Sequence, residues 1–268
     1  MTEEQLATIE AICGAAVENI ERFPGGDISG ASAVRLADGR KLVAKYGPVV
    51  AVEAGMLRAM QAASTPSPRV IGCRDDVIVI EHLVADGAFQ NAWDSLAEAL
   101  FGLGELTSES YGWHEDYALR HVQVENSPCD SWSRFWAERR LACHVSHLEP
   151  SLGRRIEKLA DALEEIIPAK PVATFVHGDL WGGNVLASGN RITGLIDPCA
   201  CWGDREVDAA SLTVFDHPPE SFFAALDLES GWRERQPVYR LWMWLLHVRL
   251  FGDSYRPAVE RELDTLGF

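Results

Sequence analysis

The first twenty residues carry apolar side chains at helical spacing. Thr2 and Gln5 form a capping-box pattern, in which each side chain bonds the other residue's backbone N–H at the start of a helix. The apolar positions that follow are Leu6, Ile9, Cys13, Val17 and Ile20. This spacing predicts one long helix that is broken only at Gly25-Gly26.

Beyond these glycines the pattern changes to short apolar runs. Two of the runs flank Asp38-Gly39, a dipeptide typical of tight hairpin turns. A longer segment with helical spacing precedes Pro66 and Pro68, and prolines of this kind commonly follow a helix end. The predicted elements are strands at 33–37 and 41–46, a helix at 49–63, and strands at 70–71 and 77–80.

After about residue 84 helical patterns dominate the chain. The predicted helices are 93–106, 132–148, 152–167, 207–215, 237–252 and 257–266, and the short strands between them are 172–176, 185–187 and 192–196. A strand-rich first part followed by a helical part predicts an α+β fold of two lobes, residues 1–84 and 85–268, hinged around a cleft.

Composition narrows the class of protein. The chain has 268 residues, of which 47% are hydrophobic and 24% charged, so it can bury a core without disulfides. Forty acidic residues against 24 basic ones give a net charge of −16, which excludes a general nucleic-acid binder and argues against an anionic membrane surface. No apolar run is long enough to span a membrane, and the N-terminus is acidic where a signal peptide is basic. We expect a cytoplasmic protein whose six cysteines are reduced thiols.

The most informative segment reads His-Gly-Asp-Leu-Trp-Gly-Gly-Asn at 177–184, followed by Ile-Asp-Pro at 196–198. Phosphoryl transfer needs one carboxylate to accept or orient the proton of the attacking hydroxyl. It also needs an amide oxygen and a second carboxylate to hold Mg²⁺ against the nucleotide phosphates. Asp179 and Asn184 have the Asp-x-x-x-x-Asn spacing of the protein-kinase template, and a hairpin at 185–196 would return Asp197 to Asn184. An Asp-x-x-x-x-Asn pair alone also fits a plain turn with a helix cap, so the prediction depends on the whole set.

A kinase site also needs a lysine for the phosphates, and the chain has four lysines. Lys158 and Lys170 lie in polar surroundings that predict exposure, and Lys41 adjoins the hairpin turn. Lys45 lies deep in a strand, where a cation is costly unless it is paired. Its predicted partner is Glu53, one turn into the next helix. The alternatives are a Lys45 side chain that points to solvent and a Glu53 that only interacts with the helix dipole.

These motifs resemble the fructosamine kinase (ketosamine 3-kinase) family, a branch of the protein-kinase-like aminoglycoside phosphotransferase superfamily. The similarity runs from about Gly25 to Tyr255 and includes Gly-Asp-Arg-Glu-Val-Asp at 203–208. This run and Trp181 separate the branch from choline and aminoglycoside kinases. The resemblance implies a two-lobed kinase-like fold, a small β-rich lobe and a larger helical lobe. It also implies ATP- and Mg²⁺-dependent phosphorylation of the 3-hydroxyl of a free or protein-bound ketosamine.

The resemblance further implies a role for each site residue. It assigns Asp179 as the base and Asn184 and Asp197 as Mg²⁺ ligands. Lys45 and Glu53 would position the α- and β-phosphates, and adenine would bond the backbone of Glu81, His82 and Leu83. Asp208 would brace the catalytic loop. From the sequence itself, His177 is expected to hydrogen-bond that loop. The glycine-rich segment at 25–32, with Gly30 and Ser32, either folds over the phosphates or forms a plain strand turn.

The acceptor site is less constrained by the sequence. Trp181 and Trp202 are expected near the cleft, and Asp204 and Glu206 are candidates to attract a cationic ketosamine. The alternative is that Asp204 and Glu206 cap the next helix and pair internally.

Three departures from the family pattern leave the substrate open: Thr107, Tyr117 and Cys201. Two alternatives therefore stand beside the ketosamine kinase. One is a small-molecule kinase for an amino alcohol or aminoglycoside, and the other is a pseudokinase-like module that binds nucleotide without turnover. We expect a monomer without nucleic-acid or membrane partners.

Overall fold

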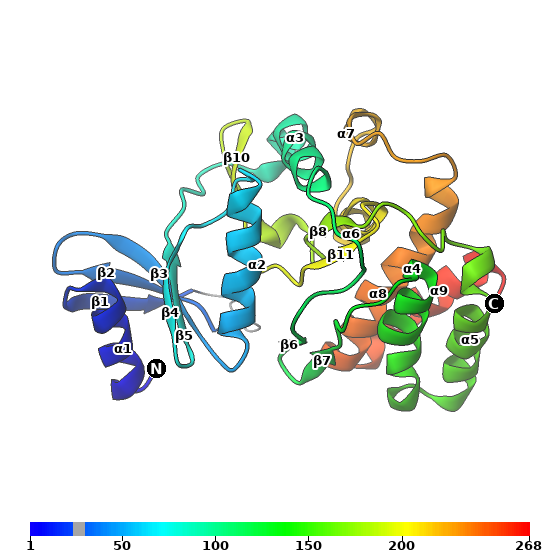
Figure 1. Cartoon of the computed structure of the whole chain (residues 1–268), viewed down its shortest axis with the longest axis horizontal. Helices are drawn as coiled ribbons and strands as arrows, with labels where there is room; N and C mark the ends of the chain where they lie inside the picture. The colour runs from blue at the N-terminus through cyan, green and yellow to red at the C-terminus, as the bar shows by residue number, and fades with distance from the viewer. Residues whose placement is uncertain (24–29) are drawn as a thin grey trace. The chain divides into compact units, whose positions relative to one another are not determined.

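The computed structural model describes residues 1–23 and 30–268 and divides the chain into two compact units (Figure 1). The sheet unit contains Met1–Leu96 and Gly183–Cys199, and the helical unit contains Ala97–Gly182 and Ala200–Phe268. The segment Gly183–Cys199 therefore packs with the N-terminal residues although it is distant from them in sequence. The lobe boundary after residue 84 stays a prediction.

The sheet unit is built on five antiparallel strands in the order β1-β2-β3-β5-β4. In chain order they are β1 (Val17–Arg22), β2 (Ser32–Leu36), β3 (Lys41–Tyr46), β4 (Val70–Arg74) and β5 (Val77–Glu81). The predicted hairpin is confirmed, since β2 pairs with β3 across a turn in which Gly39 has a φ of +87°. Only glycine adopts this left-handed conformation without strain, which fixes the register of the two strands.

Side chains alternate between the two faces of this sheet. Helix α1 (Glu3–Cys13) packs its Ile9 and Cys13 against one face, where Leu42 and Ala44 of β3 are also buried. Alternation along β3 directs Lys45 to the opposite face, where it meets helix α2 (Val50–Ala62). The two helices lie on opposite sides of the sheet in Figure 1.

The prediction of one long N-terminal helix is wrong. The capping box at Thr2 is confirmed, but the helix ends at Cys13 because Gly14 takes a left-handed φ of +66° and its N–H bonds the Glu10 carbonyl. Val17 then begins β1, which pairs with β2. Pairing with a neighbouring strand decides the conformation here, and the helical spacing of the apolar residues is coincidental. The expected break at Gly25-Gly26 lies outside the described residues.

A two-stranded hairpin completes the sheet unit. Strands β9 (Val185–Ser188) and β10 (Arg191–Leu195) pair as predicted, with Leu195 opposite Val185. The N–H of Leu195 bonds the carbonyl of Pro66, and Gly87 pairs with Ala187, so backbone hydrogen bonds join the hairpin to the rest of the unit.

The helical unit contains most of the helices and two short β ladders. The helices are α3 (Trp93–Gly104), which begins in the sheet unit, α4 (Trp132–Trp136), α5 (Pro150–Asp161), α6 (Glu206–Phe215), α7 (Glu220–Ala225), α8 (Trp232–Phe251) and α9 (Arg256–Leu266). The ladders pair β6 (Tyr117–Leu119) with β7 (Val122–Val124), and β8 (Thr174–Val176) with β11 (Cys201–Gly203). Its core centres on the fully buried rings of Trp132, Trp136 and Tyr239. No helix in the described part of the chain is long and apolar enough to cross a membrane.

The predicted helix at 132–148 is also irregular. Helix α4 is followed by a π-helical turn at Ala137–Leu141 and a 3₁₀ segment at Ala142–His147. The wide turn carries Arg140, whose buried guanidinium bonds the Glu125 carbonyl and the Asn126 side chain. Apolar spacing cannot anticipate this distortion, because two of the bonds of Arg140 are made to residues outside its own helix.

Candidate active site

The charged centre of the sheet unit joins Lys45, Glu53 and Asp197. The Lys45 side chain is only 4% exposed, and its Nζ donates hydrogen bonds to Oε1 of Glu53 and, at 2.5 Å, to Oδ1 of Asp197. Three separate segments, β3, α2 and the chain after β10, therefore meet at one ammonium group. The Lys45 side chain does not point to solvent, and Glu53 bonds it directly.

Electrostatics keep this lysine charged. Burial by itself lowers the pKa of Lys45, but the carboxylates of Glu53 and Asp197 outweigh burial and raise that pKa above its ordinary value. A buried cation with two carboxylates can contact a phosphate while it remains neutralised by the protein. This arrangement suits the binding of nucleotide phosphates.

Asp197 is the open member of the cluster. Its side chain is 27% exposed, against 4% for Lys45 and 5% for Glu53. Its φ of +56° lies in the left-handed region, an uncommon conformation for a residue with a side chain and one that is concentrated at functional sites. The hairpin returns the chain as predicted, since the N–H of Ile196 bonds the Asn184 carbonyl at 3.0 Å.

The donors present suit magnesium that arrives with a nucleotide. The Asn184 side chain has an amide oxygen and the Asp197 side chain a carboxylate, and Mg²⁺ prefers oxygen donors of both kinds. Within the described residues, no group of three or more His, Cys, Asp and Glu side chains could hold a metal ion by itself. Mg²⁺ commonly binds through one or two protein side chains plus substrate phosphates, and the small donor set fits that mode.

The loop that carries Asp179 belongs to the helical unit and is fixed to helix α6. The Asp208 carboxylate accepts the backbone N–H groups of His177 at 2.7 Å and Gly178 at 2.9 Å. The N–H of Asp179 in turn reaches Nδ1 of His177 at 3.4 Å. Burial raises the pKa of Asp208 to about 6, and its two backbone bonds oppose that rise. His177 and Asp208 therefore both lie beside this loop and bond its backbone.

Asp216 contacts the loop and is not among the site residues expected from the sequence. Asp216, directly after α6, accepts the N–H of Gly182 through Oδ2 at 2.7 Å. Its signal in the sequence is only an aspartate at the end of a predicted helix. Such an aspartate has no pattern that points to a distant glycine, so the contact appears only in the fold.

The predicted acceptor residues fall into two groups. Trp181 is 39% exposed and contacts the ring of Phe215, whereas Trp202 is half-buried against Trp113 and Phe175. Asp204 and Glu206 are both buried and bonded within the helical unit.

The bonds of these two carboxylates are internal. Asp204 accepts from the Tyr239 hydroxyl at 2.9 Å and from the Glu206 N–H at 3.0 Å, and Glu206 forms a two-point ion pair with Arg235. This is the arrangement expected of the structural alternative, helix capping and internal pairing. Burial and the neighbouring Glu206 raise the pKa of Asp204 to about 7.

The residues expected to contact adenine follow one another at the end of β5, but their contacts differ. His82, just after β5, lines an open hollow with Arg35 and Lys41, which stand opposite each other on the Lys45 face of the sheet. Leu83 packs against Gly194, where a Cβ atom would approach the Leu83 Cδ1 to 2.2 Å. Glu81 ends β5, and its N–H bonds the Arg69 carbonyl.

The place of Ser32 in the phosphate loop stays a prediction, because the expected contact is through the backbone and the structure describes its side chain. Ser32 lies opposite Ala44 in the register, on the face covered by α1, and its hydroxyl hydrogen-bonds Tyr46. It therefore lies on the opposite face from Lys45. Gly30 has a left-handed φ of +59°, and the rest of the glycine-rich segment, residues 25–29, lies outside the described residues.

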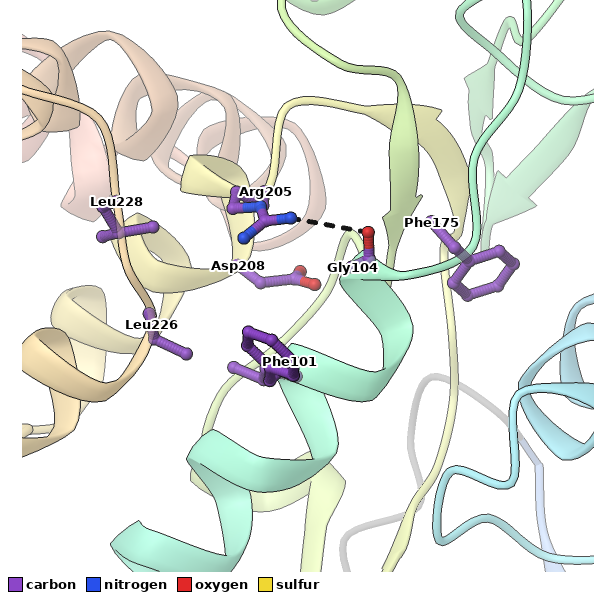
Figure 2. Close-up of a pocket in the computed structure, with 8 residues that line it drawn as sticks. Phe101, Gly104, Phe175, Arg205, Asp208, Leu226 and Leu228 are labelled. Atoms are coloured by element: carbon purple, nitrogen blue, oxygen red, sulfur yellow. Dashed lines mark hydrogen bonds between the residues drawn. The ribbon is translucent and has the colours of Figure 1, made fainter.

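A small pocket that is open to solvent adjoins Asp208 (Figure 2). The view shows Phe101 of α3 and Leu226 and Leu228 around it, with Arg205 bonded to the Gly104 carbonyl. Asp208 is the only predicted site residue in its lining. All of its lining residues belong to the helical unit.

The departures from the family pattern lie in short β pairings of the helical unit. Thr107 pairs with Thr174, Tyr117 begins β6, and Cys201 begins β11. All six cysteines lie in the described part of the chain and are free thiols.

The family model and the curated relatives of this chain point to the same family. A family model described as fructosamine kinase matches residues 1–266. The chain is 28% identical over 277 residues to the "Probable ketoamine kinase YniA" of Escherichia coli K12, a match that covers 93% of each protein. It is 30% identical over 180 residues to a "Probable ketoamine kinase" of Enterococcus faecium, which covers 63% of this chain and 65% of that protein.

Solved structures agree with this result. A candidate fructosamine-3-kinase of Thermobifida fusca has a TM-score of 0.90 at 27% identity, with 99% of each chain covered. A mutant of the aminoglycoside phosphotransferase APH(4)-Ia, solved with AMP-PNP and hygromycin B, has a TM-score of 0.68 at 16% identity and covers 98% of this chain and 96% of that one. The second likeness shows the fold alone. Together they confirm the predicted α+β, protein-kinase-like fold.

Proposed function

Because the chain belongs to the fructosamine kinase family, we propose that this phosphotransferase uses ATP and Mg²⁺ to phosphorylate the 3-hydroxyl of ketosamines. The observation that carries the proposal is the ion network of Lys45, Glu53 and Asp197. Burying a lysine and two carboxylates costs desolvation free energy, so the cluster is poorly explained by stability alone. A role in binding nucleotide phosphates explains why these charges are kept together.

The nucleotide is held by the sheet unit in this proposal. Lys45, oriented by Glu53, contacts the α- and β-phosphates, and the backbone at Glu81, His82 and Leu83 receives adenine. Asn184 and Asp197 would hold Mg²⁺, which when bound neutralises charge that develops on the phosphates. Gly30 and Ser32 remain candidates for a phosphate contact through the backbone of this segment.

The acceptor is activated by Asp179. Its carboxylate orients the 3-hydroxyl and takes the proton as the new O–P bond forms and the bond to the leaving ADP oxygen breaks. Asp208 and His177 hold the loop that carries Asp179. Because Asp179 is fixed by backbone bonds on both of its preceding residues, the reactive oxygen needs little reorganisation during the transfer.

Recognition of the acceptor rests on charge and on one exposed ring. The net charge of −16 attracts a cationic amine over long range, and Trp181 offers an exposed face to the carbon skeleton of the sugar. Trp202 is a weaker candidate, since much of its ring is buried. Asp204 and Glu206 are assigned to the structure of the helical unit and not to the substrate.

The competing functions make different use of the same residues. A kinase for an amino alcohol or an aminoglycoside would share the Lys45 cluster and differ only in the acceptor. A nucleotide-binding module without turnover is disfavoured, because Lys45, Asp179, Asn184 and Asp197 are all present. We place the enzyme in the cytoplasm as a monomer.

The test is ATP consumption with Mg²⁺ against a panel of acceptors, namely fructosamines, ribulosamines, erythrulosamines, choline and aminoglycosides. We expect turnover with at least one ketosamine, and phosphorus NMR should place the new phosphate on the 3-oxygen. Turnover of choline or an aminoglycoside alone would replace the proposal by the second candidate. Nucleotide binding with no turnover of any acceptor would favour the binding module.

A further inference from the structure

Helix α6 contacts the catalytic loop at two places. Asp208, in its first turn, accepts the N–H groups of His177 and Gly178, which precede Asp179. Asp216, directly after its last turn, accepts the N–H of Gly182, which follows Asp179. The backbone of the loop is therefore bonded on both sides of Asp179 by carboxylates at the two ends of one helix.

The second contact is held firmly in place. The N–H of Asp216 bonds the Leu212 carbonyl at 3.0 Å, so the residue is fixed to the end of α6. The preceding Phe215 packs edge-on against Trp181, with ring centroids 5.8 Å apart. Two successive residues at the end of α6 thus contact two successive residues of the loop.

The hydrogen bond from Gly182 to Asp216 is charge-assisted. A carboxylate that accepts a backbone N–H makes a shorter and stronger hydrogen bond than a neutral acceptor does. Half-burial of Asp216 raises its pKa, and the Gly182 bond opposes that rise and favours the charged form. A glycine has the largest backbone freedom to lose, so an external bond at Gly182 restricts the conformations open to this residue.

We propose that Asp216 is a positioning residue that fixes the second half of the catalytic loop, between Asp179 and the magnesium ligand Asn184. It contacts neither substrate nor metal and acts through the Gly182 backbone. The inference rests on the proposed function for its kinetic consequence, but its structural consequence can be measured on the free protein.

The experiment compares three variants with the parent protein. Asp216→Ala removes the acceptor, Asp216→Asn keeps an acceptor oxygen without the charge, and Glu220→Ala removes an exposed carboxylate of α7 that pairs with Arg233. Hydrogen exchange of the free protein is followed in the peptide 177–184, and kcat and KM are measured with the best ketosamine.

We expect Asp216→Ala to speed exchange at the Gly182 amide about tenfold, as the loss of one charge-assisted hydrogen bond implies. We also expect kcat to fall about tenfold while KM for ATP stays within about twofold. Asp216→Asn keeps a neutral acceptor and should recover part of both losses, and Glu220→Ala should behave as the parent. If the alanine variant does not fold, Asp216→Ser takes its place with the same expectations.

Unchanged exchange and kcat in Asp216→Ala would overturn the inference. So would a loss of kcat shared by the alanine and asparagine variants with exchange unchanged, because the charge would then act on the substrate. If the parent phosphorylates no ketosamine, the proposed function fails, while the exchange result still decides the role of Asp216.

Discussion

Two clusters of buried charge, one in each unit, resemble each other in chemistry and differ in access. The cluster of the sheet unit joins Lys45 to Glu53 and Asp197, and its Asp197 side chain is 27% exposed. In the cluster of the helical unit, Asp204 bonds Tyr239 and Glu206 bonds Arg235. There every carboxylate is nearly closed off from solvent, with Asp204 5% and Glu206 3% exposed.

Solvent access of a carboxylate distinguishes an ion cluster that can bind a ligand from one that only stabilises the fold. Both sets need their partners, because an unpaired buried charge is costly. Only the first leaves a carboxylate at a surface that a ligand can reach, on a residue in a strained left-handed conformation. Burial of charge therefore indicates function only together with access.

The largest effect is expected at Asp179, outside both clusters. Asp179→Asn removes the base, and kcat should fall by roughly 10²–10⁴-fold while the affinity for ATP is kept. Steady-state kinetics with a ketosamine, together with ATP titration, measure both quantities. Equal kcat in variant and parent would remove Asp179 from the reaction.

The next effect tests the open member of the first cluster. Asp197→Ala should weaken Mg²⁺-dependent ATP binding by at least roughly tenfold, because it removes the carboxylate assigned to the metal. Nucleotide titrations with and without Mg²⁺, and a circular dichroism spectrum to check folding, test this. If Mg²⁺ enhances ATP binding equally in variant and parent, Asp197 is not the ligand.

A third prediction concerns the closed cluster. Glu206→Gln leaves Arg235 without its buried partner, and breaking such a pair costs about 3–5 kcal/mol. At roughly 2–4 °C per kcal/mol for a chain of this size, Tm should fall by roughly 6–20 °C. Scanning calorimetry measures this loss, and KM for the ketosamine should stay unchanged. A raised KM with an unchanged Tm would return Glu206 to the acceptor site.

A fourth prediction concerns the pH dependence of stability. The pKa of Asp204 is raised by burial and by Glu206 from 3.8 to about 7, so the folded state holds this proton more tightly than the unfolded chain does. The stability contributed by protonated Asp204 is complete below roughly pH 4 and is lost as pH rises toward about 7. Asp204→Asn stays neutral, and its Tm should fall less steeply than that of the parent between roughly pH 4 and 7. Parallel curves would contradict the shifted pKa.

The sequence anticipated the parts of the site that depend on local chemistry. A lysine deep in a strand requires a partner, which indicated Glu53, and a hairpin after Asn184 returned Asp197 to it. The turn at Gly39 and the capping box at Thr2 were predictable because each depends on a few adjacent residues.

What the sequence could not predict depends on distant partners. β1 is a strand because β2 pairs with it, and Ser32 faces α1 because the register of the sheet places it there. Glu206 and Arg235 are 29 residues apart, and no local pattern joins them. The Asp216 bond to Gly182 spans 34 residues and likewise depends on the fold.

The most direct test of the central claim is calorimetric titration of ATP with Mg²⁺ into Lys45→Met and Glu206→Gln. We expect Lys45→Met to bind ATP at least roughly tenfold more weakly, since it loses the cation that contacts the phosphates. Glu206→Gln should bind ATP as the parent does, despite its lower Tm. Normal ATP affinity in Lys45→Met, or weakened affinity in a folded Glu206→Gln protein, would contradict the division into a working cluster and a structural one.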